Sequence, residues 1–245
     1  MLRIEMLYPE AANLYGDRFN AWYLQKSCPG STVISTSFSD VPAFAKGEAD
    51  IVCMGGAPEI YQEKAIAALM PYRSALQECI DKGTIFLFTG NAVEAAAEYI
   101  ENEDGSRIGS LGLTKLYAKR DRMNRYNSIF LGSFDGGESG QIEIAGFRSQ
   151  SSMMYGDNSS FYAFASEKGC GINRESTLAG VRLGNFFGTY LLGPLLPMNP
   201  EFTRYILRLA GENEAAPAFE KEAAAAFEAR LMEFRDPHFA TENLR

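Results

Sequence analysis

The chain has 245 residues, of which 46% are hydrophobic, and its formal net charge is −8. This length and composition predict a globular protein with a sizeable buried core rather than a disordered chain. The negative charge argues against a nucleic-acid partner, because binding phosphates requires a basic surface. The four cysteines are scattered, without a CxxC pair or the spacing of metal ligands, and this pattern indicates reduced thiols in a cytoplasmic protein.

We expect neither a signal peptide nor a membrane span. The N-terminal segment, MLRIEMLYPE, carries Glu5 within a short apolar stretch and lacks a small-residue cleavage site, so it predicts a first strand. The longest apolar stretch, at 186–197, is interrupted by Gly188, Gly193 and Pro194 and is too short to cross a bilayer.

Up to residue 100, apolar segments typical of strands alternate with segments typical of helices. The expected strands are 2–7, 32–38, 51–54 and 84–88, and the expected helices are 19–28, 59–81 with a break at Pro71, and 92–100. Strands that alternate with helices predict a parallel sheet with right-handed crossovers.

After residue 104 the pattern changes to shorter strands, joined by turns that contain Gly, Asp and Asn. We expect strands at 108–113, 129–134 and 141–147, a loop of fixed shape at 184–202, and helices at 201–209 and 218–234. No linker divides the chain. The sequence therefore predicts one α/β domain over 1–245, with a mostly parallel sheet, helices on both faces and a few antiparallel strands in the second half.

Two glycines follow the strand at 51–54, in the string IVCMGGAPE. Gly55 and Gly56 would let backbone N–H groups approach a ligand closely, as in an oxyanion hole or an anion-binding nest. The same glycines also suit an ordinary tight turn between a strand and a helix. The pair alone does not decide between these two interpretations.

A second turn follows the strand at 84–88, in the string TIFLFTGNAVEAAAEY. A strand, a sharp glycine turn and a helix form a nucleophile elbow, which presents one side chain at the carboxyl end of the strand. Thr89 occupies that apex and Gly90 follows it. The alternative is an ordinary turn in which Thr89 is the N-cap of the helix.

Together these segments resemble the cobyric acid synthase-like class I glutamine amidotransferases, and among them the small glutaminase subunit of lipid II isoglutaminyl synthase. The resemblance rests on LYPEAANLYGDRFN at 7–20, GGAPEIYQEKAIAAL at 55–69, DGSRIGSLGL at 104–113, AGFRSQSS at 145–152 and GTYLLGPLLPMNP at 188–200. It implies a three-layer, flavodoxin-like α/β fold and no cofactor. It also implies a Mur-ligase-like, ATP-dependent synthetase as partner, with a cell-wall or cobyrinate-type acceptor.

The resemblance further implies a nucleophilic cysteine at the elbow and a histidine in the loop GTYLLGP, and this chain has neither. Thr89 stands at the cysteine position and Leu192 at the histidine position. The family elbow Cys-Gly-Gly-Tyr-Gln is replaced by TGNAV at 89–93, and the family motif Gly-Phe-Glu-Asn-His by GFRSQ at 146–150. Arg125 falls near the position of the family's arginine that holds the glutamine carboxylate.

Thr89 and Leu192 do not supply the chemistry of a cysteine and a histidine. A thiol is partly ionised near neutral pH, whereas a threonine hydroxyl needs a strong adjacent base. Leu192 accepts no proton. Removing a nucleophile or its base costs about 10⁶ in kcat, or roughly 8 kcal/mol, so we expect no useful glutaminase activity.

Four other side chains are candidates for a replacement nucleophile or base. Glu94 and Cys53 lie close in sequence to the two glycine turns, Cys170 lies between two glycines, and His238 is the only histidine of the chain. Each also has an ordinary structural interpretation. Glu94 would point away from the elbow, Cys53 would be a small buried hydrophobe, and Cys170 and His238 would be loop and tail residues.

The first loop contains the polar residues Asn13, Tyr15, Asp17 and Arg18. An ion pair between Asp17 and Arg18 would pin a turn there. Alternatively, these residues lie at the edge of the ligand pocket or of a partner interface. Arg125 has the same two interpretations, as a solvent-exposed charge or as a ligand contact.

We expect the pocket at the carboxyl ends of the central strands, where open α/β sheets bind their ligands. It should be lined by Gly55, Gly56, Thr89, Gly90 and Leu192. The leading hypothesis is a catalytically silent binding or regulatory subunit. The second is an active amidotransferase with an unrecognised nucleophile, and the third is a sensor that binds a glutamine-like small molecule in this pocket.

Overall fold

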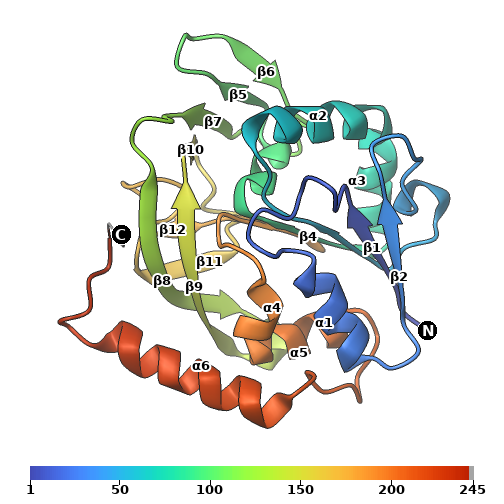
Figure 1. Ribbon diagram of the computed structural model, residues 1–245, viewed down its shortest axis with the longest axis vertical. Coiled ribbons are helices and arrows are strands. Elements are labelled where there is room, and N and C mark those ends of the chain that lie inside the picture. The colour runs from blue at the N-terminus through green and yellow to red at the C-terminus, as the bar shows by residue number, and fades with distance from the viewer. Residues whose placement is uncertain (243–245) are drawn as a thin grey trace.

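The computed structural model describes residues 1–242 and is built around a six-stranded sheet (Figure 1). The strand order is β13-β14-β4-β3-β1-β2, and every neighbouring pair is parallel except β13 with β14. These strands are β1 (Arg3–Leu7), β2 (Thr32–Thr36), β3 (Ile51–Met54), β4 (Ile85–Thr89), β13 (Val181–Leu183) and β14 (Phe186–Thr189). The mostly parallel sheet predicted from the sequence is confirmed.

Helices cover both faces of this sheet, as the sequence predicted (Figure 1). One face carries α1 (Phe19–Ser27), α4 (Leu195–Met198) and α5 (Pro200–Leu209), and the other carries α2 (Glu59–Leu69) and α3 (Arg73–Asp81). The predicted break at Pro71 is also confirmed, because a single 3-10 turn separates α2 from α3. The result is a three-layer α/β fold.

The strand β4 shows how the sequence divides the core between the two faces. Successive side chains of a strand point to opposite faces. Phe86 and Phe88 pack with the buried side of α2 and α3, whereas Ile85 and Leu87 pack with α1 and α5. All four are fully buried, so the continuous apolar run TIFLF marks a central strand rather than an edge strand.

The second half of the chain adds two four-stranded sheets to this frame. One has the order β10-β7-β5-β6 and the other β12-β11-β8-β9. Their strands are β5 (Tyr99–Glu101), β6 (Arg107–Gly109), β7 (Tyr117–Arg120), β8 (Tyr126–Asp135), β9 (Gln141–Gln150), β10 (Ser152–Tyr155), β11 (Phe164–Lys168) and β12 (Leu178–Ala179). The antiparallel strands expected in the second half therefore form sheets of their own.

The long hairpin of β8 and β9 packs on the central sheet with one face and on a helix with the other. Phe130 and Ile144 join the core beneath α5, whereas Ile129 and Leu131 pack against α6 (Glu220–Arg235). In Figure 1 this helix runs along the outside of the hairpin. The helix predicted at 218–234 is thus confirmed, and it packs on the outside of this hairpin.

Two local predictions were wrong. The helix expected at 92–100 is a short 3-10 segment, η3 (Gly90–Ala96), followed by the strand β5. The Ala-rich sequence favours a helix, but β5 pairs with both β6 and β7, and this tertiary pairing outweighs local propensity. The segment 184–202, expected as a loop, contains the central strand β14 and the helix α4. Its glycines and prolines separate these short elements.

No helix within residues 1–242 is both long enough and apolar enough to cross a membrane.

Candidate functional site

The carboxyl ends of β4 and β14 bring together the two positions that the resemblance makes catalytic. These strands are parallel neighbours, and Thr89 lies opposite Thr189 in their register. Beyond the strands, the N–H of Gly90 donates to the carbonyl of Leu191 at 3.0 Å. Thr89 is the last residue of β4, Leu192 lies three residues beyond the end of β14, and each is one residue from this hydrogen bond.

Thr89 is a fully buried residue with an ordinary strand conformation. Its φ and ψ are −112° and 158°, and the positive φ of 60° belongs to Gly90. The hydroxyl of Thr89 donates to Asp17 Oδ1 at 2.6 Å. Thr89 is thus neither the strained apex of an elbow nor an exposed hydroxyl, because its only proton is committed to a buried carboxylate.

Asp17 is the centre of this corner. It is 3% exposed, and it accepts hydrogen bonds from the Thr89 hydroxyl and from the backbone N–H of Tyr15. Burial raises the pKa of Asp17 above its usual value, and the hydrogen bonds to its carboxyl only partly offset that shift. Of the two interpretations of the first loop, the ion pair of Asp17 with Arg18 is not the one seen, since the Asp17 carboxylate is buried and bonds to Thr89.

Asp17 lies so close to the backbone at positions 55 and 193 that only glycine fits at each of them. A Cβ atom on Gly55 would lie 2.2 Å from the Cβ of Asp17, and one on Gly193 would lie 2.4 Å from its Oδ1. No real side chain tolerates such contacts. Gly55 is therefore needed because the buried Asp17 side chain packs against it. The sequence had suggested either contact with a bound anion or an ordinary turn at this position.

Two backbone N–H groups that could form an oxyanion hole, those of Gly90 and Ala57, already bond within the protein. Gly90 donates to Leu191. The N–H of Ala57 donates to Asn91 Oδ1 at 2.9 Å, and Asn91 Nδ2 returns a hydrogen bond to the carbonyl of Ala57 at 2.8 Å. An oxyanion at this corner would have to displace one of these bonds.

A small pocket opens beside this corner. Its volume is about 50 Å³, which has room for a few water molecules and falls well short of the ~300–1,000 Å³ of usual ligand pockets. Gly90, Leu192 and Arg125 line it, whereas Gly55, Gly56 and Thr89 do not. The full lining is Leu14, Tyr15, Ala57, Pro58, Glu59, Gly90, Asn91, Arg125, Ser149, Gln150, Ser151, Tyr190 and Leu192.

Arg125 reaches across the mouth of the small pocket. One of its terminal nitrogens donates to the Tyr15 hydroxyl at 3.4 Å and to Ser149 Oγ at 3.3 Å. The side chain is otherwise exposed. A guanidinium with several unused N–H groups at a pocket rim suits a carboxylate. Arg125 is therefore both a solvent-exposed charge and a residue placed to contact a ligand, which were the two interpretations of the sequence.

Sequence reasoning missed the pairing of Ser151 with Glu59. The Ser151 hydroxyl donates to Glu59 Oε1 at 2.9 Å within the pocket wall. Burial favours the neutral form of Glu59, but hydrogen bonds from its own backbone and from Ser151 outweigh this effect and leave its pKa lowered. The signal was the serine-rich end of AGFRSQSS, but its partner lies 92 residues away in the chain.

Glu94 is fully buried in a polar network instead of facing Thr89. It accepts hydrogen bonds from the hydroxyls of Ser152 and Tyr190 and, at 2.8 Å, from Gln62 Nε2. Gln62 in turn accepts a 2.8 Å bond from the buried guanidinium of Arg120. Burial raises the pKa of Glu94. Glu94 thus links η3 to β10 and to the residue that follows β14, and it points away from the elbow, as the sequence interpretation expected.

None of the four cysteines lines the small pocket, and three are buried. Burial raises the pKa of Cys53 to about 12, which makes its thiol inert near neutral pH. Cys170 is buried beside Arg148, whose Nη1 lies 3.3 Å from its sulfur. His238 is exposed after α6. Among residues 1–242, no three His, Cys, Asp or Glu side chains are grouped to hold a metal ion.

The fold of this chain is that of the class I glutamine amidotransferases. It superposes on a chain of the PurLQS complex from Thermotoga maritima with a TM-score of 0.54 at 14% identity, covering 94% of this chain and 99% of the other. It also superposes on a solved glutamine amidotransferase with a TM-score of 0.50 at 13% identity, covering 84% of this chain and 98% of the other. At these identities the similarity establishes the fold alone.

Two curated proteins are similar to this chain in sequence. Both are the subunit GatD of a glutamine-hydrolysing lipid II isoglutaminyl synthase. The one from Staphylococcus aureus is 26% identical over 223 residues, which are 90% of this chain and 89% of the relative. The one from Streptococcus pneumoniae is 25% identical over 229 residues, which are 89% and 86% of the two chains. No protein-family model matches the chain.

Proposed function

We propose that this chain is a non-catalytic member of the class I glutamine amidotransferase family that acts as a binding or regulatory subunit. One observation carries the proposal. The residue at the nucleophile position is a buried threonine whose hydroxyl donates to Asp17, and no cysteine or histidine of residues 1–242 lines the adjacent pocket. The volume of about 50 Å³ and the occupied N–H groups also oppose binding and cleavage of glutamine.

The partner proposed for this subunit is a Mur-ligase-like, ATP-dependent synthetase, and the proposed compartment is the cytoplasm. Similarity along about nine-tenths of the chain to two proteins named as subunits of lipid II isoglutaminyl synthase supports this choice. A subunit whose role is to bind such a partner would retain the fold even after it lost the catalytic residues. A cobyrinate-type acceptor belongs to the same proposal as its alternative.

The Ser151–Glu59 pair favours a second candidate, an active amidotransferase that uses Ser151 as nucleophile and Glu59 as base. Both residues line the small pocket and are hydrogen-bonded to each other. Two features oppose this candidate. The lowered pKa makes Glu59 a weak base, and the N–H groups near Gly90 are already bonded.

Ammonia release from glutamine separates the two candidates. The purified chain, alone and mixed with the Mur-ligase-like synthetase of the same cell, should release no more ammonia than a blank without protein. The matched control is Ser106→Ala, which breaks a similar but exposed serine–carboxylate pair with Asp104. Ammonia release that survives in Ser106→Ala and disappears in Ser151→Ala would establish the second candidate and refute the first.

A further inference from the structure

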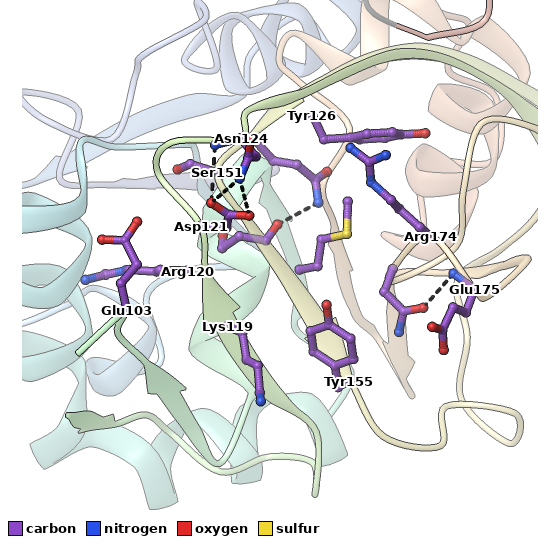
Figure 2. Close-up of a pocket in the computed structure, with 14 residues that line it drawn as sticks. Glu103, Lys119, Arg120, Asp121, Asn124, Tyr126, Ser151, Tyr155, Arg174 and Glu175 are labelled. Atoms are coloured by element: carbon purple, nitrogen blue, oxygen red, sulfur yellow. Dashed lines mark hydrogen bonds between the residues drawn. The ribbon is translucent and has the colours of Figure 1, made fainter. Parts of the chain in front are cut away.

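A polar cavity adjoins the small pocket and shares Gln150 and Ser151 with it. Its volume is about 780 Å³, and Figure 2 shows the polar and charged side chains around its opening. Three of these, Glu103, Lys119 and Arg120, already form ion pairs with other residues. Because its charges are of both signs and partly paired, this cavity indicates no single class of ligand.

A groove between α1 and β2 is apolar instead, and its volume is about 460 Å³. Phe19 and Trp22 of α1, Met6 of β1 and Val33 of β2 supply its apolar walls. Phe19 and Trp22 are 43% and 44% exposed, and their rings meet edge to face. Two large aromatic side chains left this exposed beside a groove indicate a binding surface.

The strand β2, which forms one wall of this groove, is an open edge of the six-stranded sheet (Figure 1). Within residues 1–242 it pairs only with β1, and the N–H of Thr32 donates to the carbonyl of Leu2 at 2.9 Å. Backbone polar groups alternate between the two sides of a strand. The N–H and C=O groups of Val33 and Ser35 therefore point away from β1, where they are free to pair with a further strand.

The strand β2 lacks the features that usually protect an open edge. Charged side chains, prolines and very short strands prevent pairing between edges. The opposite edge strand, β13, has three residues and carries Arg182. By contrast, β2 has five residues, TVIST, of which four are β-branched and none is charged. Such a strand favours the addition of a neighbour.

The charged side chains at the groove are cations. Arg18 lines the groove, and Lys26 lies over the ring of Trp22 at 5.3 Å. Neither forms an ion pair within residues 1–242, and no acidic residue lines the groove. This local positive charge, in a chain of net charge −8, favours a partner with acidic side chains. It disfavours a second copy, because two-fold pairing of β2 edges would bring like charges together.

From this arrangement we infer that β2 and the groove bind an extended, acidic segment of another protein, which adds a strand to the sheet. The backbone of the segment pairs with Val33 and Ser35. Every second side chain of the segment points to the α1 side and packs against Phe19 and Trp22, and neighbouring carboxylates meet Arg18. This surface goes beyond the proposed function, because it lies at the edge of the sheet, three strands away from β4.

Fluorescence of Trp22, the only tryptophan of the chain, tests the inference on the full chain. The probe is the capped peptide EVTFTVE, in which apolar residues alternate with threonines between terminal glutamates. Binding should shift the Trp22 emission to shorter wavelength, since the ring leaves water, and should slow amide exchange at Val33 and Ser35. A peptide N-methylated along the edge that faces β2 keeps its side chains and charges but cannot pair. It should bind at least about ten-fold more weakly.

Two variants separate backbone pairing from charge. Val33→Pro removes an N–H that points away from the sheet, so the fold should tolerate it, as urea unfolding checks, while the peptide binds at least about ten-fold more weakly. Arg18→Glu should weaken binding at least about five-fold. Its control is Lys221→Glu, which makes the same charge change at the start of α6 and should leave binding unchanged.

Four results would overturn the inference. The first is an unchanged Trp22 emission at millimolar peptide. The second is equal binding of the N-methylated peptide, and the third is undiminished binding by Val33→Pro or by Arg18→Glu. The fourth is a dimer of the chain that Val33→Pro dissociates, which would make a second copy the occupant of this edge. The proposed function is judged separately, by ammonia release.

Discussion

Replacing Thr89 by Cys, Asn91 by Gly and Leu192 by His together should raise glutamine hydrolysis at least about 100-fold above the parent chain. The first and third changes return a thiol to the end of β4 and an imidazole to the segment that follows β14. Loss of such a pair costs about 10⁶ in kcat. The second change releases the N–H of Ala57, which Asn91 now occupies, and widens the pocket that Asn91 lines. Ammonia release measures the outcome.

The variant without the change at Asn91 is the informative comparison. With Thr89→Cys and Leu192→His alone, the oxyanion donor stays bonded to Asn91, so we expect less than about a tenth of the rate of the triple variant. Asn91→Gly alone should release no ammonia. Equal rates in the double and triple variants would show that Asn91 does not obstruct the site.

Replacing Asp17 by Ala should lower the free energy of unfolding by about 3–5 kcal/mol. The change leaves the Thr89 hydroxyl and the backbone N–H of Tyr15 without this acceptor, and it opens a cavity between Gly55 and Gly193. Urea unfolding measures the loss. The control is Asp40→Ala, which removes an exposed carboxylate that also accepts a backbone N–H and should cost under about 1 kcal/mol.

The effect of Asp17→Ala should depend on pH in a defined direction. Because burial raises the folded-state pKa of Asp17, the neutral carboxyl is the form that the fold favours. The stabilisation linked to that shift is complete below the unfolded pKa of about 3.9 and is lost as the pH rises through the folded pKa. The variant should therefore differ most from the parent in acid. A larger difference at neutral pH would contradict the assigned environment of Asp17.

Much of the fold could be predicted because the strongest signals were local. Buried parallel strands such as β3 and β4 are continuous apolar runs, and α5 begins at a proline that suits the first turn of a helix. The segment 92–100 was wrongly predicted as a helix because its alanines favour one, whereas the strands that pair with β5 lie further along the chain. Local propensity does not report such pairing.

The site was predictable only in part, for a similar reason. Thr89 ends β4, and Leu192 lies three residues beyond the end of β14, the parallel neighbour of β4, so that the sheet places both at the same edge. The burial of Asp17 does not, because an aspartate next to Arg18 in a polar loop is typical of a surface ion pair. Only the structure shows that Gly55 and Gly193 make room for its carboxylate.

Reaction with a diazoketone analogue of glutamine tests the absence of a nucleophile most directly. Intact-mass measurement after incubation should show no added mass on the parent chain. The triple variant at Thr89, Asn91 and Leu192 should gain one label at position 89 and serves as the positive control. A label on Thr89, Ser151 or any cysteine of the parent chain, with free glutamine protecting against it, would contradict the account.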